Sequence, residues 1–333
     1  MAATRSPANR QRLPTGSQHR SASFIDPTAL MRIRNLQLRA KVVVDGFLSG
    51  MHKSPVHGFS VEFTEYRQYS PGDDLRYLDW RLYARSDRYY LKRFEDETNL
   101  RCWLLADLSR SMGFGSRDYN KAEYAKTVAA TIAYFLTLQR DAVGLITFDQ
   151  TIQDFLPARF RPGHMHRLMM SLERAPAGKG TDLAGALEQV AKTARKRGLV
   201  VLLSDLLAPV EAVETQLGYL RSRGHDIAVI RILDPAEVDF PFQEESLFYD
   251  VETGRELYVD PKMARERYRE RFAEHSRAMT RVCNGLGADI YEVTTDRPLD
   301  AVLADFLHLR LRRGRHATRR ARPLPAARAG GRA

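Results

Sequence analysis

The fold is decided by the stretch Leu104-Leu105-Ala106-Asp107-Leu108-Ser109-Arg110-Ser111-Met112-Gly113. It closes a run, residues 100–106, that is apolar except for Arg101, which is typical of a strand buried on both faces of a parallel sheet. An acid and two hydroxyl residues follow at once, so polar oxygens collect where the strand ends. In an open α/β sheet, ligands bind at the carboxyl ends of the strands. The stretch therefore predicts a buried strand and a candidate ligand site.

Downstream of this strand, apolar patterns of strand and helix period alternate along the chain. Such alternation predicts a doubly wound, mostly parallel α/β sheet, the Rossmann-like class. The predicted strands are residues 100–106, 142–148, 152–156 (as a hairpin partner), 199–203, 227–233 and 289–293. The predicted helices are residues 121–139, 163–173, 182–197, 209–222, 261–285 and 298–311, with a β-hairpin at 246–259 that turns on Thr253-Gly254.

The segments around this region differ from it in composition. Residues 1–25 are polar and basic and predict a disordered lead, as does the Arg-rich tail at 312–333. Apolar residues near helical spacing predict one amphipathic helix over residues 28–49. Short β-like runs, Phe59–Phe63 and Tyr89–Phe94, flank turn residues and indicate a small β-rich part. We expect four segments: 1–25, a helix with a β-rich extension at 26–99, an α/β domain at 100–311, and 312–333.

The net charge of +11 comes from the two tails. Residues 1–23 hold four arginines and no acid, and residues 310–333 hold nine arginines and no acid. Against the net +11, these thirteen charges leave −2 for the rest of the chain. A basic nucleic-acid-binding face on the folded body is therefore not indicated. Because the N-terminus lacks an apolar core and no apolar run is long enough to cross a bilayer, we expect a cytoplasmic protein.

Two further oxygen-bearing residues are expected at the same edge as Asp107. Thr181 lies in a glycine loop, Gly178-Lys179-Gly180-Thr181-Asp182, that leads into a helix, and Asp205 follows a buried strand. Together with Ser109 and Ser111 they offer the oxygen ligands that Mg²⁺ or Mn²⁺ prefers. The alternative is that these side chains only cap helices and satisfy turn amides.

The order Asp107-x-Ser109-x-Ser111, then Thr181, then Asp205 resembles the metal-ion-dependent adhesion site of von Willebrand factor A domains, and all five positions match. The resemblance implies that the serines and the threonine contact the ion, and that the aspartates act directly or through water. It also implies an open position on the ion for an acidic residue of a partner. With only two carboxylates among the five, we expect weak binding of the ion that the partner tightens.

A second signature precedes this domain. It comprises Gly58-Phe59, Glu62-Phe63, the run from Glu65 through Tyr69-Ser70-Pro71-Gly72-Asp73-Asp74 to Trp80, and Ala84-Arg85. The signature resembles the bacterial family known as domain of unknown function 58 (DUF58), strongly over about residues 45–150 and less specifically to about 260. The resemblance implies a MoxR-type AAA+ ATPase as partner, because such ATPases are typically encoded beside family members. Within Pro71–Arg85 we favour an internal ion-pair network over an interface, since charges of both signs are closely interleaved.

The cysteines and histidines do not indicate a second functional site. The two cysteines, Cys102 and Cys283, lie in apolar surroundings and are expected to be reduced core residues, with one disulfide as the alternative. No nucleophile elbow, phosphate-binding loop or zinc-protease motif is present. The histidines do not have zinc-ligand spacing, and His164 and His166 are expected to begin a helix.

Three hypotheses of function follow. The first is a non-catalytic adaptor that binds a client protein's acidic residue through the cation and works with a MoxR-type ATPase. The second is a metal-dependent hydrolase that uses the same ion, which the lack of a general base beside the motif argues against. The third is nucleic-acid binding through the arginine tails.

Overall fold

A computed structural model describes residues 25–53, 65–68, 90–93, 100–174, 183–193, 197–249 and 256–308. At its centre is a six-stranded sheet with the strand order β10-β7-β6-β3-β4-β5. All neighbours are parallel except β5, which runs antiparallel to β4. Numbered in chain order within the sheet, this arrangement reads 3-2-1-4-5-6, the order of a doubly wound fold. The strands are β3 (Arg101–Asp107), β4 (Ala142–Phe148), β5 (Ile152–Arg159), β6 (Leu199–Ser204), β7 (Asp226–Leu233) and β10 (Asp289–Thr294).

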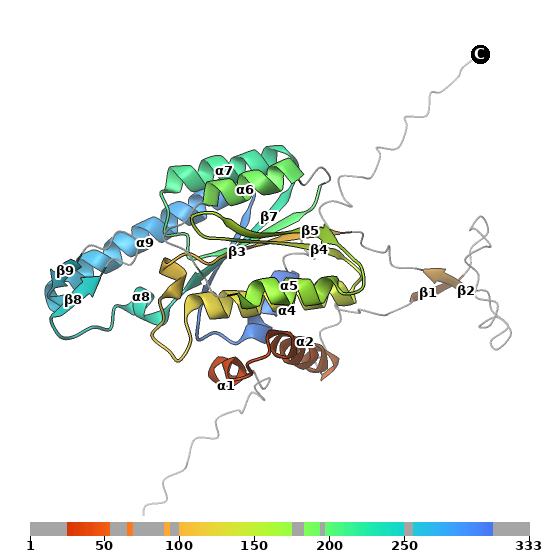
Figure 1. Cartoon of the computed structure of the whole chain (residues 1–333), viewed down its shortest axis with the longest axis horizontal. Helices are drawn as coiled ribbons and strands as arrows, with labels where there is room; N and C mark the ends of the chain where they lie inside the picture. The colour runs from red at the N-terminus through yellow and green to blue at the C-terminus, as the bar shows by residue number, and fades with distance from the viewer. Residues whose placement is uncertain are drawn as a thin grey trace, which may run out of the picture.

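Helices cover both faces of the sheet, as the alternating pattern predicted (Figure 1). Side chains of β3 alternate between the two resulting cores: Cys102 and Leu104 face one core, and Trp103 and Leu105 face the other. Burial of both faces accounts for the apolar run in the sequence. One face carries α4 (Lys121–Leu138), α5 (His164–Glu173) and the helical residues 299–308; the other carries α6 (Leu183–Thr193), α7 (Val210–Ser222) and α9 (Pro261–Gly285).

The predicted single helix at 28–49 is wrong in one respect, because the structure has two helices there. These are α1 (Pro27–Met31) and α2 (Leu36–Lys53). The chain turns between them at Asn35, whose Oδ1 accepts a hydrogen bond of 2.7 Å from the amide of Leu38. A side-chain cap of this kind starts a new helix, and the continuous apolar spacing concealed it.

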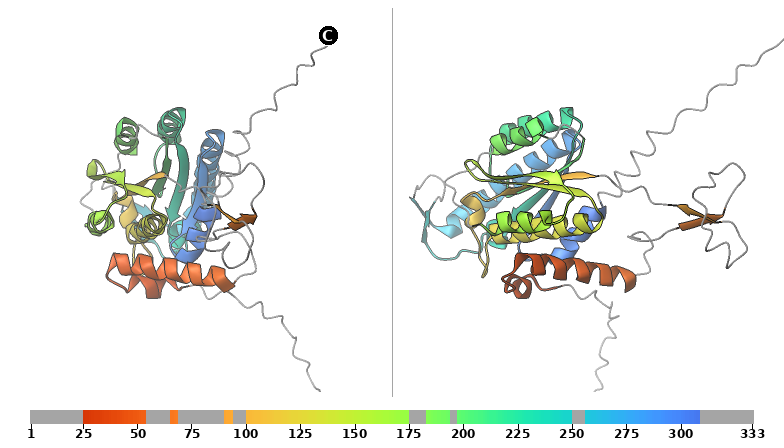
Figure 2. Two further views of the ribbon diagram at one scale, coloured as in Figure 1. Left: turned by 90° about the vertical axis from the view of Figure 1, so that its right-hand side faces the viewer. Right: turned by 45° about the vertical axis from the view of Figure 1, so that its right-hand side comes forward.

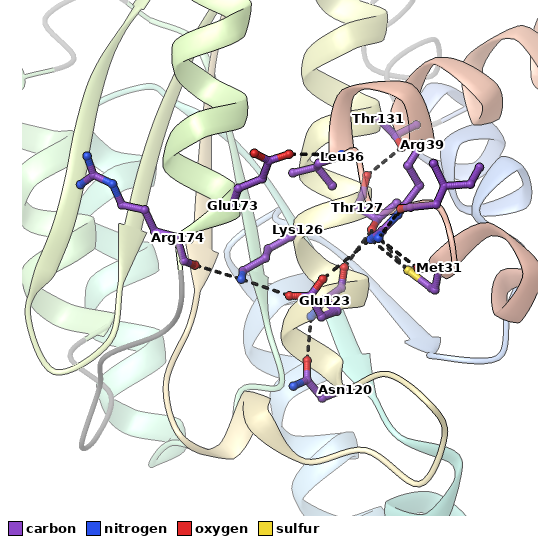
Figure 3. A network of polar contacts seen from close by, with 11 residues as sticks. Met31, Leu36, Arg39, Asn120, Glu123, Lys126, Thr127, Thr131, Glu173 and Arg174 are labelled. Carbon is purple, nitrogen blue, oxygen red and sulfur yellow. Dashed lines mark hydrogen bonds and ion pairs between the residues drawn. The ribbon is translucent and has the colours of Figure 1, made fainter.

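Helix α2 packs on α4 and adds a further layer outside the three layers of helices, sheet and helices (Figure 2). Its apolar residues Ala40, Val43 and Val44 are buried in the same core as α4. A buried guanidinium, that of Arg39, fastens the junction: it donates to the hydroxyl of Thr127 on α4 at 2.8 Å (Figure 3).

The elements outside the central sheet and its helices include two hairpin-like pairs of strands and two short helices. The strands β1 (Glu65–Gln68) and β2 (Tyr90–Arg93) pair antiparallel, and β8 (Ser246–Tyr249) and β9 (Glu256–Val259) form the expected hairpin. The short helices η2 (Ser111–Gly113) and α8 (Pro235–Asp239) were not predicted. None of the helices in the described ranges is long and apolar enough to cross a membrane. The predicted run 59–63, the Pro71–Arg85 segment, the Thr253-Gly254 turn, most of the lead and the Arg-rich tail lie outside the described residues.

Candidate metal centre

Strands β3 and β6 lie next to each other at the centre of the sheet; Asp107 ends β3, and Asp205 directly follows β6. The two strands pair in parallel, with Ala106 opposite Leu203, so that Asp107 and Asp205 follow at the same edge. This is the point where the strand order reverses, with β4 and β5 on one side and β7 and β10 on the other. In doubly wound sheets the ligand-binding crevice lies at this switch point.

The carboxylate of Asp107 is completely buried and held from two sides. Its Oδ1 accepts a hydrogen bond from the amide of Ser109 at 2.9 Å, and its Oδ2 accepts one from the hydroxyl of Ser204 at 2.6 Å. The first contact is a local turn and the second reaches across from β6. The capping interpretation therefore holds in part, but a turn amide does not explain why an acid is buried here.

The hydroxyls of Ser109 and Ser111 are hydrogen-bonded to each other at 3.1 Å, and both residues are buried. Two oxygens that bind one Mg²⁺ ion at right angles, each at about 2.1 Å, would lie about 3.0 Å apart. The turn from β3 into η2 thus brings the two hydroxyls to the spacing of adjacent ligands. The described residues of the motif fit a hard divalent cation.

Asp205 is also buried, but its partners are different. Its Oδ2 accepts a hydrogen bond of 2.8 Å from the ammonium group of Lys121, and its Oδ1 accepts one of 3.2 Å from the amide of Leu207. Its backbone carbonyl accepts a bond of 3.0 Å from Nε of Arg231, a fully buried residue of β7. Asp205 is therefore fixed in place by α4, by β7 and by its own turn.

The residue after Asp205 has an unfavourable backbone conformation. Leu206 has a φ of 53°, in the left-handed region that a branched side chain rarely occupies. Two contacts hold it there: its amide donates to the hydroxyl of Ser204 at 3.0 Å, and its carbonyl lies 2.9 Å from Nε2 of His275. Strain of this kind costs about 1–3 kcal/mol and is found preferentially at functional sites.

The edge carries an excess of negative charge. Burial, and next the charge of Asp205, raise the pKa of Asp107 from its ordinary 3.8 to about 6, although hydrogen bonds from Ser204 and Ser109 oppose the shift. Lys121 also bonds Glu237 at 2.6 Å, so one ammonium serves two carboxylates. The acids Asp107, Asp205 and Glu237 against Lys121 leave a net −2, which one divalent cation would balance.

The family profile described as "Protein of unknown function DUF58" matches residues 65–281 of this sequence. An uncharacterized protein of Mycobacterium tuberculosis is 32% identical over 292 residues, which is 86% of this chain and 91% of the relative, and one of Mycobacterium bovis matches to the same extent. The chain belongs to the DUF58 family.

Solved structures similar to this DUF58 chain include domains of the von Willebrand factor A type. The conserved hypothetical protein BatB from Bacteroides thetaiotaomicron is 15% identical with a TM-score of 0.44, over 63% of this chain and 97% of that one. The von Willebrand A domain of SpRpn10 is 12% identical with a TM-score of 0.39, over 61% and 93%. A mussel byssus matrix protein with a zinc-occupied adhesion-site motif is 17% identical with a TM-score of 0.31, over 40% and 38%.

The structure brings four of the five predicted ligands to one edge: Asp107 and Asp205 through strand pairing, and Ser109 and Ser111 through the turn into η2. Thr181 and its neighbour Asp182 lie outside the described residues, so their placement stays a prediction. Within the described part of this DUF58 chain, no group of three or more His, Cys, Asp or Glu side chains could hold a metal ion. The candidate centre differs from such groups because half of its described ligands are hydroxyls.

Other predicted residues have structural roles or none at the site. His164 is buried, and its Nε2 lies 2.7 Å from the carbonyl of Val143, which anchors α5 to β4. His166 is exposed. Cys102 and Cys283 are both buried, one in each of the two cores on opposite faces of the sheet, so both are core residues as predicted and no disulfide joins them.

Sequence reasoning missed four side chains of this edge: Lys121, Ser204, Arg231 and Glu237. An arginine inside an apolar strand was the available signal. Arg231 interrupts the apolar strand β7, and Lys121 begins α4 directly after its cap, Asn120. Their partners, however, come from other elements that only folding brings near.

Proposed function

We propose that this DUF58 chain is a non-catalytic adaptor that binds Mg²⁺ or Mn²⁺ at the Asp107 edge and, through that ion, an acidic residue of a partner protein. The observation that carries the proposal is the pair of hydroxyls, Ser109 and Ser111, at ligand spacing beside the buried carboxylate of Asp107. Neutral hydroxyl ligands leave much of the ion's charge uncompensated, so a further carboxylate is attracted to it.

The partner that the family suggests is a MoxR-type AAA+ ATPase, which would use ATP hydrolysis to remodel or mature a client protein held by this chain. Such a role would be carried out in the cytoplasm, where the ATPase finds its nucleotide. The identity of the client does not follow from the fold, because function depends on sites and not on architecture.

Hydrolysis at the same ion is the competing activity, and the described surroundings of Asp107 do not favour it. A general base must accept a proton from an attacking water. Of the two described aspartates at the edge, Asp107 would itself hold the ion, and Asp205 is paired with the ammonium of Lys121, so neither is available to take that proton. We therefore propose binding in preference to catalysis.

The test is a pull-down of the co-expressed ATPase and client candidates with the full chain, in Mg²⁺ and in EDTA. Asp107→Ala should abolish the Mg²⁺-dependent capture. Asp226→Ala is the matched control, because Asp226 begins β7 at the opposite edge of the sheet and its side chain is exposed. Equal capture by Asp107→Ala in EDTA would contradict the proposal, and metal-dependent turnover of an ester or phosphodiester substrate would favour the hydrolase instead.

A further inference from the structure

Lys121 is a buried cation at a place where a metal-binding edge needs negative charge. Its side chain has no exposed surface, and its ammonium bonds Asp205 at 2.8 Å and Glu237 at 2.6 Å. The two carboxylates come from different elements: Asp205 follows β6, and Glu237 lies in α8. A lysine buried in this way requires such partners, because an unpaired ammonium is strongly disfavoured in the interior.

This pairing determines what Asp205 is able to do. One carboxylate oxygen is bonded to the ammonium of Lys121 and the other to the amide of Leu207, while Arg231 holds the backbone carbonyl of the same residue. Asp107, in contrast, receives its hydrogen bonds from Ser109 and Ser204, both neutral. The two aspartates at the edge are therefore not equivalent: one faces neutral donors and the other faces a cation.

We propose that Lys121 is a positioning residue that keeps Asp205 from coordinating the ion directly. The inference rests on the proposed function, since it concerns the same cation. With Asp205 held by the ammonium, the described residues that bind the ion are Asp107, Ser109 and Ser111. The ion thus keeps enough uncompensated charge to require the partner's carboxylate, and Lys121 makes the capture of a partner depend on that partner's acid.

Glu237 completes the arrangement and explains why the ammonium stays in place. Its second carboxylate oxygen accepts a hydrogen bond of 2.9 Å from the amide of Asp234, in the capping box that starts α8. The acceptor that holds Lys121 from the far side is therefore itself fixed by a helix cap. Lys121 bridges two fixed carboxylates and is not a mobile side chain.

The experiment is a titration of the full chain with Mn²⁺, followed by electron paramagnetic resonance of the free ion. Lys121→Met releases Asp205 and adds one net negative charge at the edge, so Mn²⁺ affinity should rise by about tenfold. Lys121→Arg keeps the cation and should leave the affinity near that of the wild type. Lys121→Met/Asp205→Asn should lose the gain, because the released carboxylate is no longer there.

If Lys121→Met does not fold, Lys121→Met/Glu237→Gln is compared with Glu237→Gln alone, since both of these proteins lack the second acid that contacts the ammonium. A tenfold gain in that comparison supports the inference. Loss of structure would not produce such a gain, so an affinity that is unchanged or lower without the lysine overturns the inference.

The titration also separates this inference from the proposed function. Wild-type chain that binds Mn²⁺ with no gain in Lys121→Met overturns the role of Lys121 and leaves the cation-dependent adaptor standing. Wild-type chain without measurable binding, together with clear binding by Lys121→Met, supports the role of Lys121 and contradicts the adaptor. The two outcomes cannot be confused.

Discussion

Two buried clusters of charged side chains contact α4, and they are built in opposite ways. At the first, the guanidinium of Arg39 donates to two neutral oxygens. One is the carbonyl of Ile33 at 2.8 Å, and the other is the hydroxyl of Thr127, also at 2.8 Å (Figure 3). At the second, the charge of Asp205 helps to raise the pKa of Asp107, and the ammonium of Lys121 offsets only part of the negative charge.

This difference indicates that the Arg39 cluster stabilises the fold, whereas the cluster of Asp107, Asp205 and Lys121 binds a cation. The guanidinium of Arg39 donates to neutral acceptors and has two acids near it, Glu123 at 3.8 Å and Glu173, so its hydrogen bonds are satisfied within the fold. An edge with a net −2 is left with charge that a further cation would balance. The first cluster should therefore control stability and not metal affinity, and the second should control metal affinity at a cost in stability.

Loss of Arg39 is the largest expected effect on stability. Arg39→Met removes the donors of the Ile33 carbonyl and of the Thr127 hydroxyl and should lower the free energy of unfolding by about 3 kcal/mol. Urea denaturation measures the loss. Arg34→Met is the matched control, because Arg34 is exposed in the same segment. A change in the Mn²⁺ affinity of folded Arg39→Met would contradict the expectation that the Arg39 cluster controls stability and not metal binding.

The second prediction concerns pH and the metal-free protein. Because the pKa of Asp107 is raised in the folded state, that state binds the proton more tightly than the unfolded chain does. The free energy of unfolding should therefore fall as pH rises from about 4 to about 6, by up to about 3 kcal/mol. Asp107→Asn removes this dependence.

The measurement is thermal unfolding of both proteins in EDTA across this pH range. The variant should be the more stable protein at pH values above the window, and the two should converge below it. Parallel pH profiles would mean that Asp107 is not destabilised by burial and by Asp205.

A smaller effect, on Mn²⁺ affinity, is expected from the hydrogen bond between Ser204 of β6 and Asp107 of β3. Ser204→Ala removes the hydroxyl that bonds Oδ2 of Asp107 at 2.6 Å and should weaken Mn²⁺ binding by about tenfold, since the carboxylate loses its orientation. Ser222→Ala on α7, where an exposed serine only bonds its own helix, is the control. Unchanged affinity in Ser204→Ala would show that Asp107 is positioned without help from β6.

The smallest effect is expected at Glu123. Its side chain is 45% exposed and lies 3.2 Å from the ammonium of Lys126 and 3.8 Å from Arg39. Water and salt screen such pairs, so Glu123→Gln should cost less than about 1 kcal/mol, and less still at high salt. Denaturation at two salt concentrations tests this. A loss as large as that of Arg39→Met would mean that the first cluster depends on ion pairing and not on its neutral acceptors.

The order and type of the core elements could be predicted from the sequence, because each element buries a face with its own period. The run 100–106 became β3, and the stripes at 121–139 and 261–285 became α4 and α9. The same reasoning missed the break at Asn35, where a single hydrogen bond to the amide of Leu38 outweighs a continuous apolar pattern.

Of the candidate site, the sequence predicted the residues that follow the ends of strands, but not the residues that contact them from other elements. Asp107 and Asp205 lie together because parallel strands end at one edge, which periodicity alone anticipates. Lys121 could not be foreseen: as the first residue of a helix it resembles an exposed cation, and its burial depends on Asp205, 84 residues away, and Glu237, 116 residues away. Contacts between distant segments are set by packing and leave no local pattern.

Direct titration with Mn²⁺ tests the central claim, that the Asp107 edge binds a divalent cation. Electron paramagnetic resonance of the free ion should show about one site per chain in the wild type, displaced by excess Mg²⁺, and no such site in Asp107→Ala. Binding of equal strength in both proteins, or in neither, would contradict the account.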